Sequence, residues 1–103
     1  SRRAAGAPPF GRFAAIIVSS EKAADAQETA RLIGASAPHV EGMHVYGPAP
    51  APLSVLRGRH RHRLLVHAPR SLDMQDVIRR WLGELVWKPG TRVAVDVDPY
   101  SFV

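Results

Sequence analysis

The stretch LRGRHRHRLLVH, at positions 56–67, carries an arginine at every second position. These residues are Arg57, Arg59, Arg61 and Arg63. On a helix the four guanidinium groups would scatter around the axis, whereas on a strand every second side chain points to the same face. We therefore predict a strand from Arg57 to Val66 that has the arginines on one face. The opposite face then carries His60, His62, Leu64 and Val66.

The net charge of +5 is concentrated around this arginine row. Between Gly42 and Leu72 there is no Asp or Glu, while five of the 14 Lys and Arg residues fall there. The other nine basic residues balance the nine acidic ones. Clustered cations bind phosphate groups by releasing condensed counterions, so the segment predicts a local anionic partner such as nucleic acid. The alternative is a solvated surface strand whose charges only keep the protein in solution.

Two histidines at His60 and His62 share one face of the predicted strand and could be metal ligands, with His44 or His67 as a third. Imidazole is a common ligand of zinc and nickel. We expect no metal there, because the neighbouring arginines repel a divalent ion and no third ligand stands at a diagnostic spacing. Thiolate sites are excluded, since the chain has no cysteine.

Motifs of the common enzyme classes are missing from the sequence. There is no glycine-rich phosphate loop that ends in Lys-Ser/Thr and no nucleophile elbow around a serine. The close carboxylate pair Asp96 and Asp98 supplies too few oxygens for a hard cation, which takes roughly six. We therefore predict that this chain is not an enzyme and holds no cofactor.

The composition also bears on the compartment. Absence of cysteine is typical of a reducing interior, and no apolar run approaches the roughly 20 residues of a membrane span. We expect a cytoplasmic protein with no membrane partner.

The elements that must position the arginine row follow from local patterns. Positions 1–12 predict an irregular lead-in and positions 13–103 a single domain. The apolar run 13–18 predicts a central strand, and 43–46 predicts another strand. The three prolines of 47–52 predict a stiff loop outside the sheet. The alternating segment 92–97 predicts a final strand.

Two helices are expected between these strands. The first has alanines at helical spacing, with Ser20 placed to cap its start and Gly34 to close its end. In the second, apolar residues recur from Met74 to Leu85, and Ser71 is placed as the cap. The order β-α-β-β-α-β predicts an α+β fold, in which two helices cover one face of a four-stranded, mostly antiparallel sheet, a ferredoxin-like arrangement.

Four motifs give a more specific signal than the periodicity. They are PPFGRFA at 8–14, YGPAPAPL at 46–53, LRGRHRHRLLVHAP at 56–69 and DVDPYSF at 96–102. In this order they resemble the C-terminal domain of the PriA family of replication-restart DNA helicases, also called primosomal protein N-prime. The resemblance covers the chain from Pro8 to Val103.

The resemblance implies a fold like that of ribosomal protein S10 and a role in binding DNA near a branch point. Full-length members are ATP-driven 3′-to-5′ helicases that recognise abandoned forks, bind single-stranded DNA-binding protein and start primosome assembly. They use ATP, magnesium and zinc, in parts that this chain does not contain. The expected location is the bacterial cytoplasm, in association with the nucleoid.

The resemblance also implies functional positions. A family pattern of Gly-Arg-aromatic-Arg-aromatic falls on positions 58–62, where both aromatics are histidine, so base stacking there should be weaker. In some relatives the start of the second helix binds the acidic tail of single-stranded DNA-binding protein, which here implies Arg70, Ser71 and Gln75.

Together these observations predict a noncatalytic DNA-binding domain. Its contacts are electrostatic and are made by Arg57, Arg59, Arg61 and Arg63, with His60 and His62 beside them. The alternative is a docking module whose arginines hold acidic groups of the helicase lobes or of the partner tail and touch no DNA.

Overall fold

The computed structural model describes residues 11–97, which form one four-stranded sheet and two helices. The elements are β1 (Gly11–Ser20), α1 (Ala23–Ala35), β2 (His44–Leu56), β3 (Arg59–Pro69), α2 (Met74–Gly83) and β4 (Arg92–Val97). This is the predicted β-α-β-β-α-β order.

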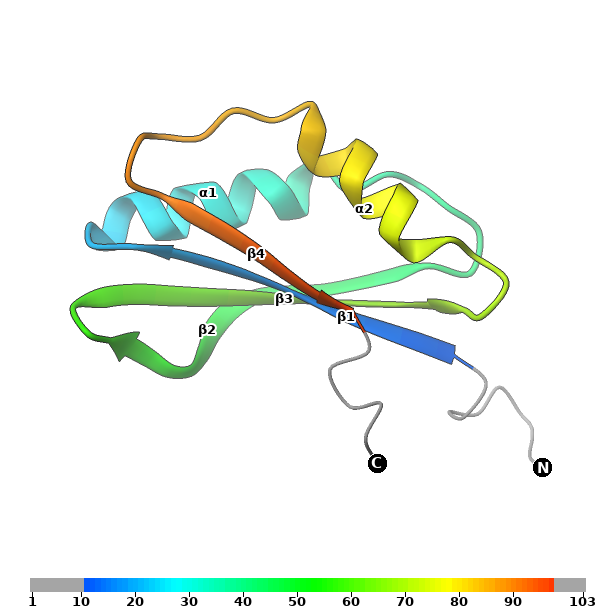
Figure 1. Cartoon of the computed structure of the whole chain (residues 1–103), viewed down its shortest axis with the longest axis horizontal. Helices are drawn as coiled ribbons and strands as arrows, with labels where there is room; N and C mark the ends of the chain where they lie inside the picture. Colours follow the sequence, from blue (N-terminus) through cyan, green and yellow to red (C-terminus); the bar gives the residue numbers. More distant parts are fainter. Residues whose placement is uncertain (1–10, 98–103) are drawn as a thin grey trace.

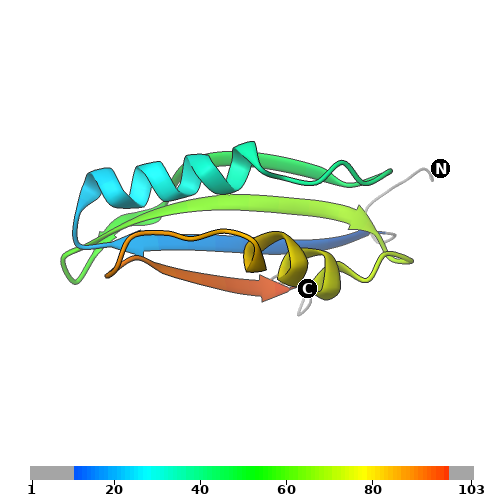
Figure 2. The same cartoon turned by 90° about the horizontal axis from the view of Figure 1, so that it is seen from above.

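The strands lie in the order β2-β3-β1-β4, and every neighbouring pair is antiparallel (Figure 1). β1 is therefore a central strand, as predicted. Both helices lie on the same side of the sheet, α1 over its β2–β3 half and α2 over its β1–β4 half (Figure 2). The other face of the sheet is called the helix-free face below. The predicted α+β fold is confirmed.

The core lies between the helices and one face of the two central strands. Cross-strand partners such as Ile16 and Leu64 have no solvent exposure. From the helices, Ile33, Ile78 and Trp81 pack against them. Because the side-chain period of a strand is two, the residues between these core positions must point to the helix-free face.

The first strand is longer than predicted. It begins at Gly11 and ends at Ser20, so the last two residues of the predicted lead-in belong to the sheet. The rest of the lead-in and the DVDPYSF motif beyond Val97 lie outside the described residues.

The prediction that the proline-rich segment 47–52 is a loop outside the sheet is wrong. β2 runs through Pro48, Pro50 and Pro52. It lies at the edge of the sheet, where a strand needs only part of its N–H groups for pairing, so prolines are tolerated. Its register with β3 shifts twice, between Tyr46 and Ala49 and again before Val55.

The predicted helix caps are corrected in both helices. Ser20 Oγ accepts a hydrogen bond from Lys22 N, but Lys22 itself is the N-cap of α1, and that helix runs one residue past Gly34. In α2 the cap is Asp73, whose carboxylate accepts from Asp76 N, whereas Ser71 lies two residues before this cap position.

Within residues 11–97, neither helix has the length and hydropathy that a membrane span requires.

Candidate nucleic-acid interface

The arginine row lies on the helix-free face of β3. Cross-strand pairing joins Arg61 to Ser19 and Arg63 to Ile17, whereas the core residue Leu64 pairs with Ile16. Arg59, Arg61 and Arg63 therefore point away from both helices. All three are partly buried, in contrast to fully buried Leu64. The prediction that these arginines lie on the face opposite to His60, His62, Leu64 and Val66 is correct for positions 59–66.

Arg57 is not part of this strand, so the prediction of an extended chain from position 57 is wrong at its first residues. Arg57 and Gly58 have positive φ angles of 52° and 78° and connect Leu56 to Arg59, which are paired. Two central residues with positive φ make the tight hairpin turn that matches the twist of the strands. Arg57 is exposed on this turn.

The guanidinium group of Arg59 is held by backbone and hydroxyl oxygens. Its Nη2 donates to the carbonyl oxygens of Ser19 at 2.9 Å and Gly90 at 3.0 Å, and its Nε donates to Ser19 Oγ at 3.2 Å. No carboxylate takes part among the described residues, so the positive charge stays available to an anion.

The guanidinium group of Arg61 is also held by backbone carbonyl oxygens, which here belong to the edge strand β2. Its Nη1 donates to the carbonyl oxygens of Pro52 and Leu53 at 2.9 and 3.0 Å. Its Nε and Nη2 have no partner within residues 11–97 and can donate to a ligand. The bonds link Arg61 to the proline-rich part of β2, which thus fixes the direction of the side chain.

Arg63 and Arg92 complete the basic surface. Neither side chain forms a hydrogen bond or an ion pair with another described residue. Arg92 is the first residue of β4 and is paired with Ser19 of β1. Ser19 is also paired with Arg61 of β3, so Arg92, Ser19 and Arg61 lie side by side across the helix-free face. We call Arg59, Arg61, Arg63 and Arg92 the arginine surface. Arg92 was missed in the sequence, although it alternates with Val93 and Val95 and so had to face away from the core.

A hollow of about 310 Å³ lies at one end of the arginine surface. Arg59 and Arg92 line it together with Lys22, and the acidic residues Glu21 and Asp25 line it as well. Asp25 is within 3.8 Å of Lys88 Nζ and is partly neutralised by it.

His60 and His62 lie on the side of β3 that faces the helices, as predicted. They pair with Ser20 and Val18 of β1 and are partly buried. Within residues 11–97 no three histidine or acidic side chains gather into a group that could hold a metal ion.

The residues predicted to bind an acidic tail are spread around the start of α2. Arg70 and Ser71 lie in the turn before the helix, and both are exposed. Gln75 is in the first turn of α2 and lines a mainly apolar hollow of about 270 Å³ between α2 and β4, together with Arg79 and Val95.

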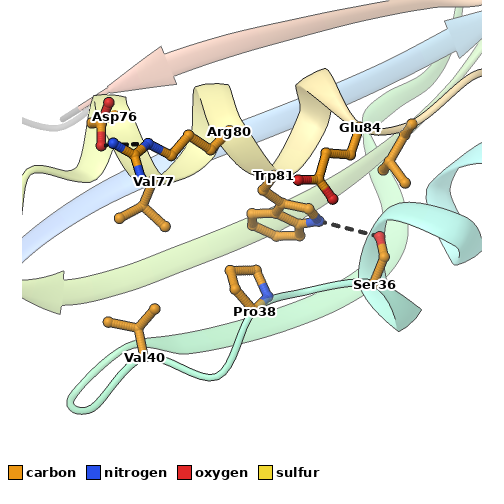
Figure 3. A pocket seen from close by; sticks show the side chains of 9 residues that line it. Ser36, Pro38, Val40, Asp76, Val77, Arg80, Trp81 and Glu84 are labelled. Atoms are coloured by element: carbon orange, nitrogen blue, oxygen red, sulfur yellow. Dashed lines mark hydrogen bonds and ion pairs between the residues drawn. The ribbon is translucent and has the colours of Figure 1, made fainter.

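Another hollow, of about 330 Å³, lies on the helix side and is lined by the side chain of Trp81 (Figure 3). The indole Nε1 donates to Ile33 O at 3.1 Å and to Ser36 Oγ at 3.3 Å. On the rim Arg80 is paired with Asp76 at 3.1 Å. The indole is thus bonded to α1 and its C-cap residue, and Arg80 to Asp76 within α2. The hollow lies on the opposite side of the sheet from the arginine surface.

Comparisons with known proteins agree with the four motifs. The family model "Primosomal protein N C-terminal domain" matches residues 3–100. The replication restart protein PriA of Rickettsia prowazekii is 32% identical over 101 residues, which cover 98% of this chain and 15% of that protein. PriA of Treponema pallidum is 35% identical over 98 residues, covering 91% of this chain and 15% of the relative.

This chain therefore spans about 15% of the length of these curated relatives. The matched region is a C-terminal domain by the description of its family model. Because that model matches nearly the whole chain, the protein belongs to the family of primosomal protein N (PriA) C-terminal domains.

Proposed function

We propose that this domain is noncatalytic and binds DNA through contacts between the arginine surface and phosphate groups. The observation that carries the proposal is the register of β3 with β1, which puts Arg61 and Arg63 on the face that neither helix covers. Arg59 is on the same face because side chains alternate along the strand. Among the described residues these arginines form no ion pair, so their charge is not neutralised from within the protein.

The hydrogen bonds of Arg59 and Arg61 support this role. A guanidinium group has five N–H donors, and here only some of them are used by carbonyl and hydroxyl oxygens. A side chain that is already held loses less conformational entropy when a phosphate binds. Such contacts do not read the base sequence, so binding tolerates different sequences and depends on the shape of the DNA.

In this proposal the parent protein is an ATP-dependent 3′-to-5′ DNA helicase that acts in replication restart and primosome assembly. The domain contributes to its recognition of branched or forked DNA. ATP, magnesium and zinc belong to other parts of the parent protein, which works in the bacterial cytoplasm at the nucleoid. The name "replication restart protein PriA", carried by the relatives, supports a role on DNA.

The β2–β3 turn extends the proposed surface beyond one face. Arg57 is exposed on the turn, and His60 and His62 lie on the side of β3 opposite to the arginines. We propose that Arg57 contacts a phosphate of the same DNA where it passes the turn, and that His60 and His62 contribute only at the edge of β3 next to this turn.

The test uses the double variant Arg63→Ala/Arg92→Ala, because neither side chain has a bond within the described protein that its removal would break. We expect about tenfold weaker binding to a forked DNA and an unchanged melting temperature. The slope of log K against log salt should fall by about two, one for each lost phosphate contact.

The control is Arg31→Ala/Arg79→Ala, which removes two arginines from the exposed side of the helices; Asp76 loses its ion pair with Arg79 and keeps the one with Arg80. It should keep most of the affinity. An equal loss in both variants, or binding that does not respond to salt, contradicts a phosphate-binding site on the helix-free face.

A second candidate function is docking of an acidic protein tail, such as that of single-stranded DNA-binding protein, or of the helicase lobes of the parent chain. The hollow beside Gln75 favours it, because apolar side chains line the hollow and Arg79 lies at its rim. An acidic tail peptide titrated onto the domain should bind less tightly when Gln75, Arg70 or Ser71 is replaced by alanine, while DNA binding stays unchanged. DNA binding that is absent while the peptide binds favours this function over the first.

A further inference from the structure

A row of rings crosses the helix-free face beside the arginine surface. His67 of β3 is paired with Phe13 of β1 on one side and with His44 of β2 on the other. The rings of Phe13 and His67 are stacked with their centroids 4.5 Å apart and an angle of 26° between their planes. Tyr46, two residues along β2, lies 6.4 Å from the ring of His44 and is 53% exposed. We call these four residues the ring row.

The position of the His67 ring depends on Gly11. A Cβ atom at position 11 would lie 2.3 Å from His67 Nε2, so the imidazole occupies the space that any other residue would fill. With Gly11 on one side and Phe13 stacked on it, the ring is held in place on the sheet. The two stacked rings come from the two central strands.

The ring row and the arginine surface are continuous. Arg63 and His67 are on the same face of one strand, four residues apart, which is about 13 Å at the rise of an antiparallel strand. On this face of the described sheet the single acidic side chain is Asp96, in β4. One end of the face thus offers cations and the other offers π-surfaces.

We propose that the ring row binds the bases of single-stranded DNA whose phosphates lie on the arginine surface. This deepens the proposed function and rests on it. Aromatic side chains beside a basic groove are how proteins hold single strands without reading their sequence, because every base has a π-face. In a duplex the bases are stacked on one another and their faces are hidden. The ring row therefore favours an unpaired strand over a duplex.

The experiment measures binding of the whole 103-residue chain to three labelled DNAs at one salt concentration: oligo-dT, an abasic strand of the same length, and a blunt duplex. Fluorescence anisotropy supplies the affinities. We expect oligo-dT to bind at least about fivefold more tightly than the abasic strand, which is the lower end of the effect of one stacked base. The abasic strand retains the phosphates and reports on the arginine surface alone.

Two variants alter the rings without altering charge. Tyr46→Ala removes an exposed ring, and Gly11→Ala displaces the imidazole of His67 while leaving the residue in place. Both should lower the affinity for oligo-dT about fivefold and leave the abasic strand unaffected. The control is Val86→Ala, which truncates an apolar side chain that is 87% exposed and lies outside the sheet; it should change neither. Melting curves of all variants show whether each is folded.

The outcomes separate this inference from the function on which it rests. Equal binding of oligo-dT and the abasic strand, or variants that weaken both strands alike, overturns base stacking on the ring row but leaves the phosphate contacts standing. Failure of the wild-type chain to bind any of the three DNAs overturns the proposed function and the inference with it.

Discussion

The two faces of the sheet are built from alternate residues of the same strands, yet they differ in almost every property. On the helix-covered face, Leu64 and Val66 are completely buried against residues of both helices. On the helix-free face, Arg61 and Arg63 are only partly buried and carry no internal ion pair within the described residues. The difference suggests that folding free energy comes mainly from one face and that the other is left for binding.

The faces are nevertheless coupled through the strand that they share. β3 is paired along its length with β1 and is joined to β2 on its other edge. Packing of the covered face keeps β3 extended, and only an extended β3 aligns its arginines. Substitutions on the covered face should therefore change stability first, whereas those on the helix-free face should change binding first.

The largest expected difference is between two neighbouring leucines of β3. Leu64→Ala should lower the free energy of unfolding by about 2–5 kcal/mol, because it leaves a cavity in a fully packed core. Leu65→Ala, on the helix-free face, should lower it by about 1 kcal/mol or less. Urea unfolding of both variants measures the difference. Similar losses at the two positions would show that the helix-free face is also packed against something.

Which side chains of β3, β4 and α2 face the core could be predicted from the sequence, because this depends only on the spacing of neighbouring residues. A period of two in β3 and β4 and a period of 3.6 in α2 are properties of neighbouring residues, and they predicted which side chains face the core. The path of β2 was not accessible in this way. Three prolines argue against a strand in general, and only its position at the edge of the sheet, which depends on the whole fold, makes them acceptable.

For the candidate site too, the features with a local cause were predicted and those that depend on the whole fold were not. The arginines of β3 were predicted from their spacing, but their partners come from distant parts of the chain, such as Gly90 for Arg59 and Pro52 for Arg61. Arg57 was misplaced because the turn occupies Arg57 and Gly58, so the strand begins two residues later than the alternation suggests. The ring row left no local signal, since Phe13, His44 and His67 become neighbours only through the strand register.

A smaller effect is expected from the indole hydrogen bond of the covered face. Trp81→Phe keeps an aromatic ring in the core but removes the donor to Ile33 O and Ser36 Oγ, which Figure 3 shows in part. We expect a loss of about 1–2 kcal/mol in the free energy of unfolding. The affinity for DNA should stay unchanged at a temperature where the variant is folded. A variant that is folded but binds DNA more weakly would break the separation between the faces.

The smallest effect tests how α2 is held over the covered face. Asp73 accepts from Asp76 N at 3.1 Å, so Asp73→Ala should cost about 1 kcal/mol through loss of the N-cap. Ser71→Ala should change stability little, because Ser71 is exposed in the turn before the helix. Thermal melting of the two variants under the same conditions gives the comparison. If Ser71→Ala costs as much as Asp73→Ala, the helix begins earlier in solution than Met74, and Gln75 then moves out of the first turn on which its proposed role in peptide binding depends.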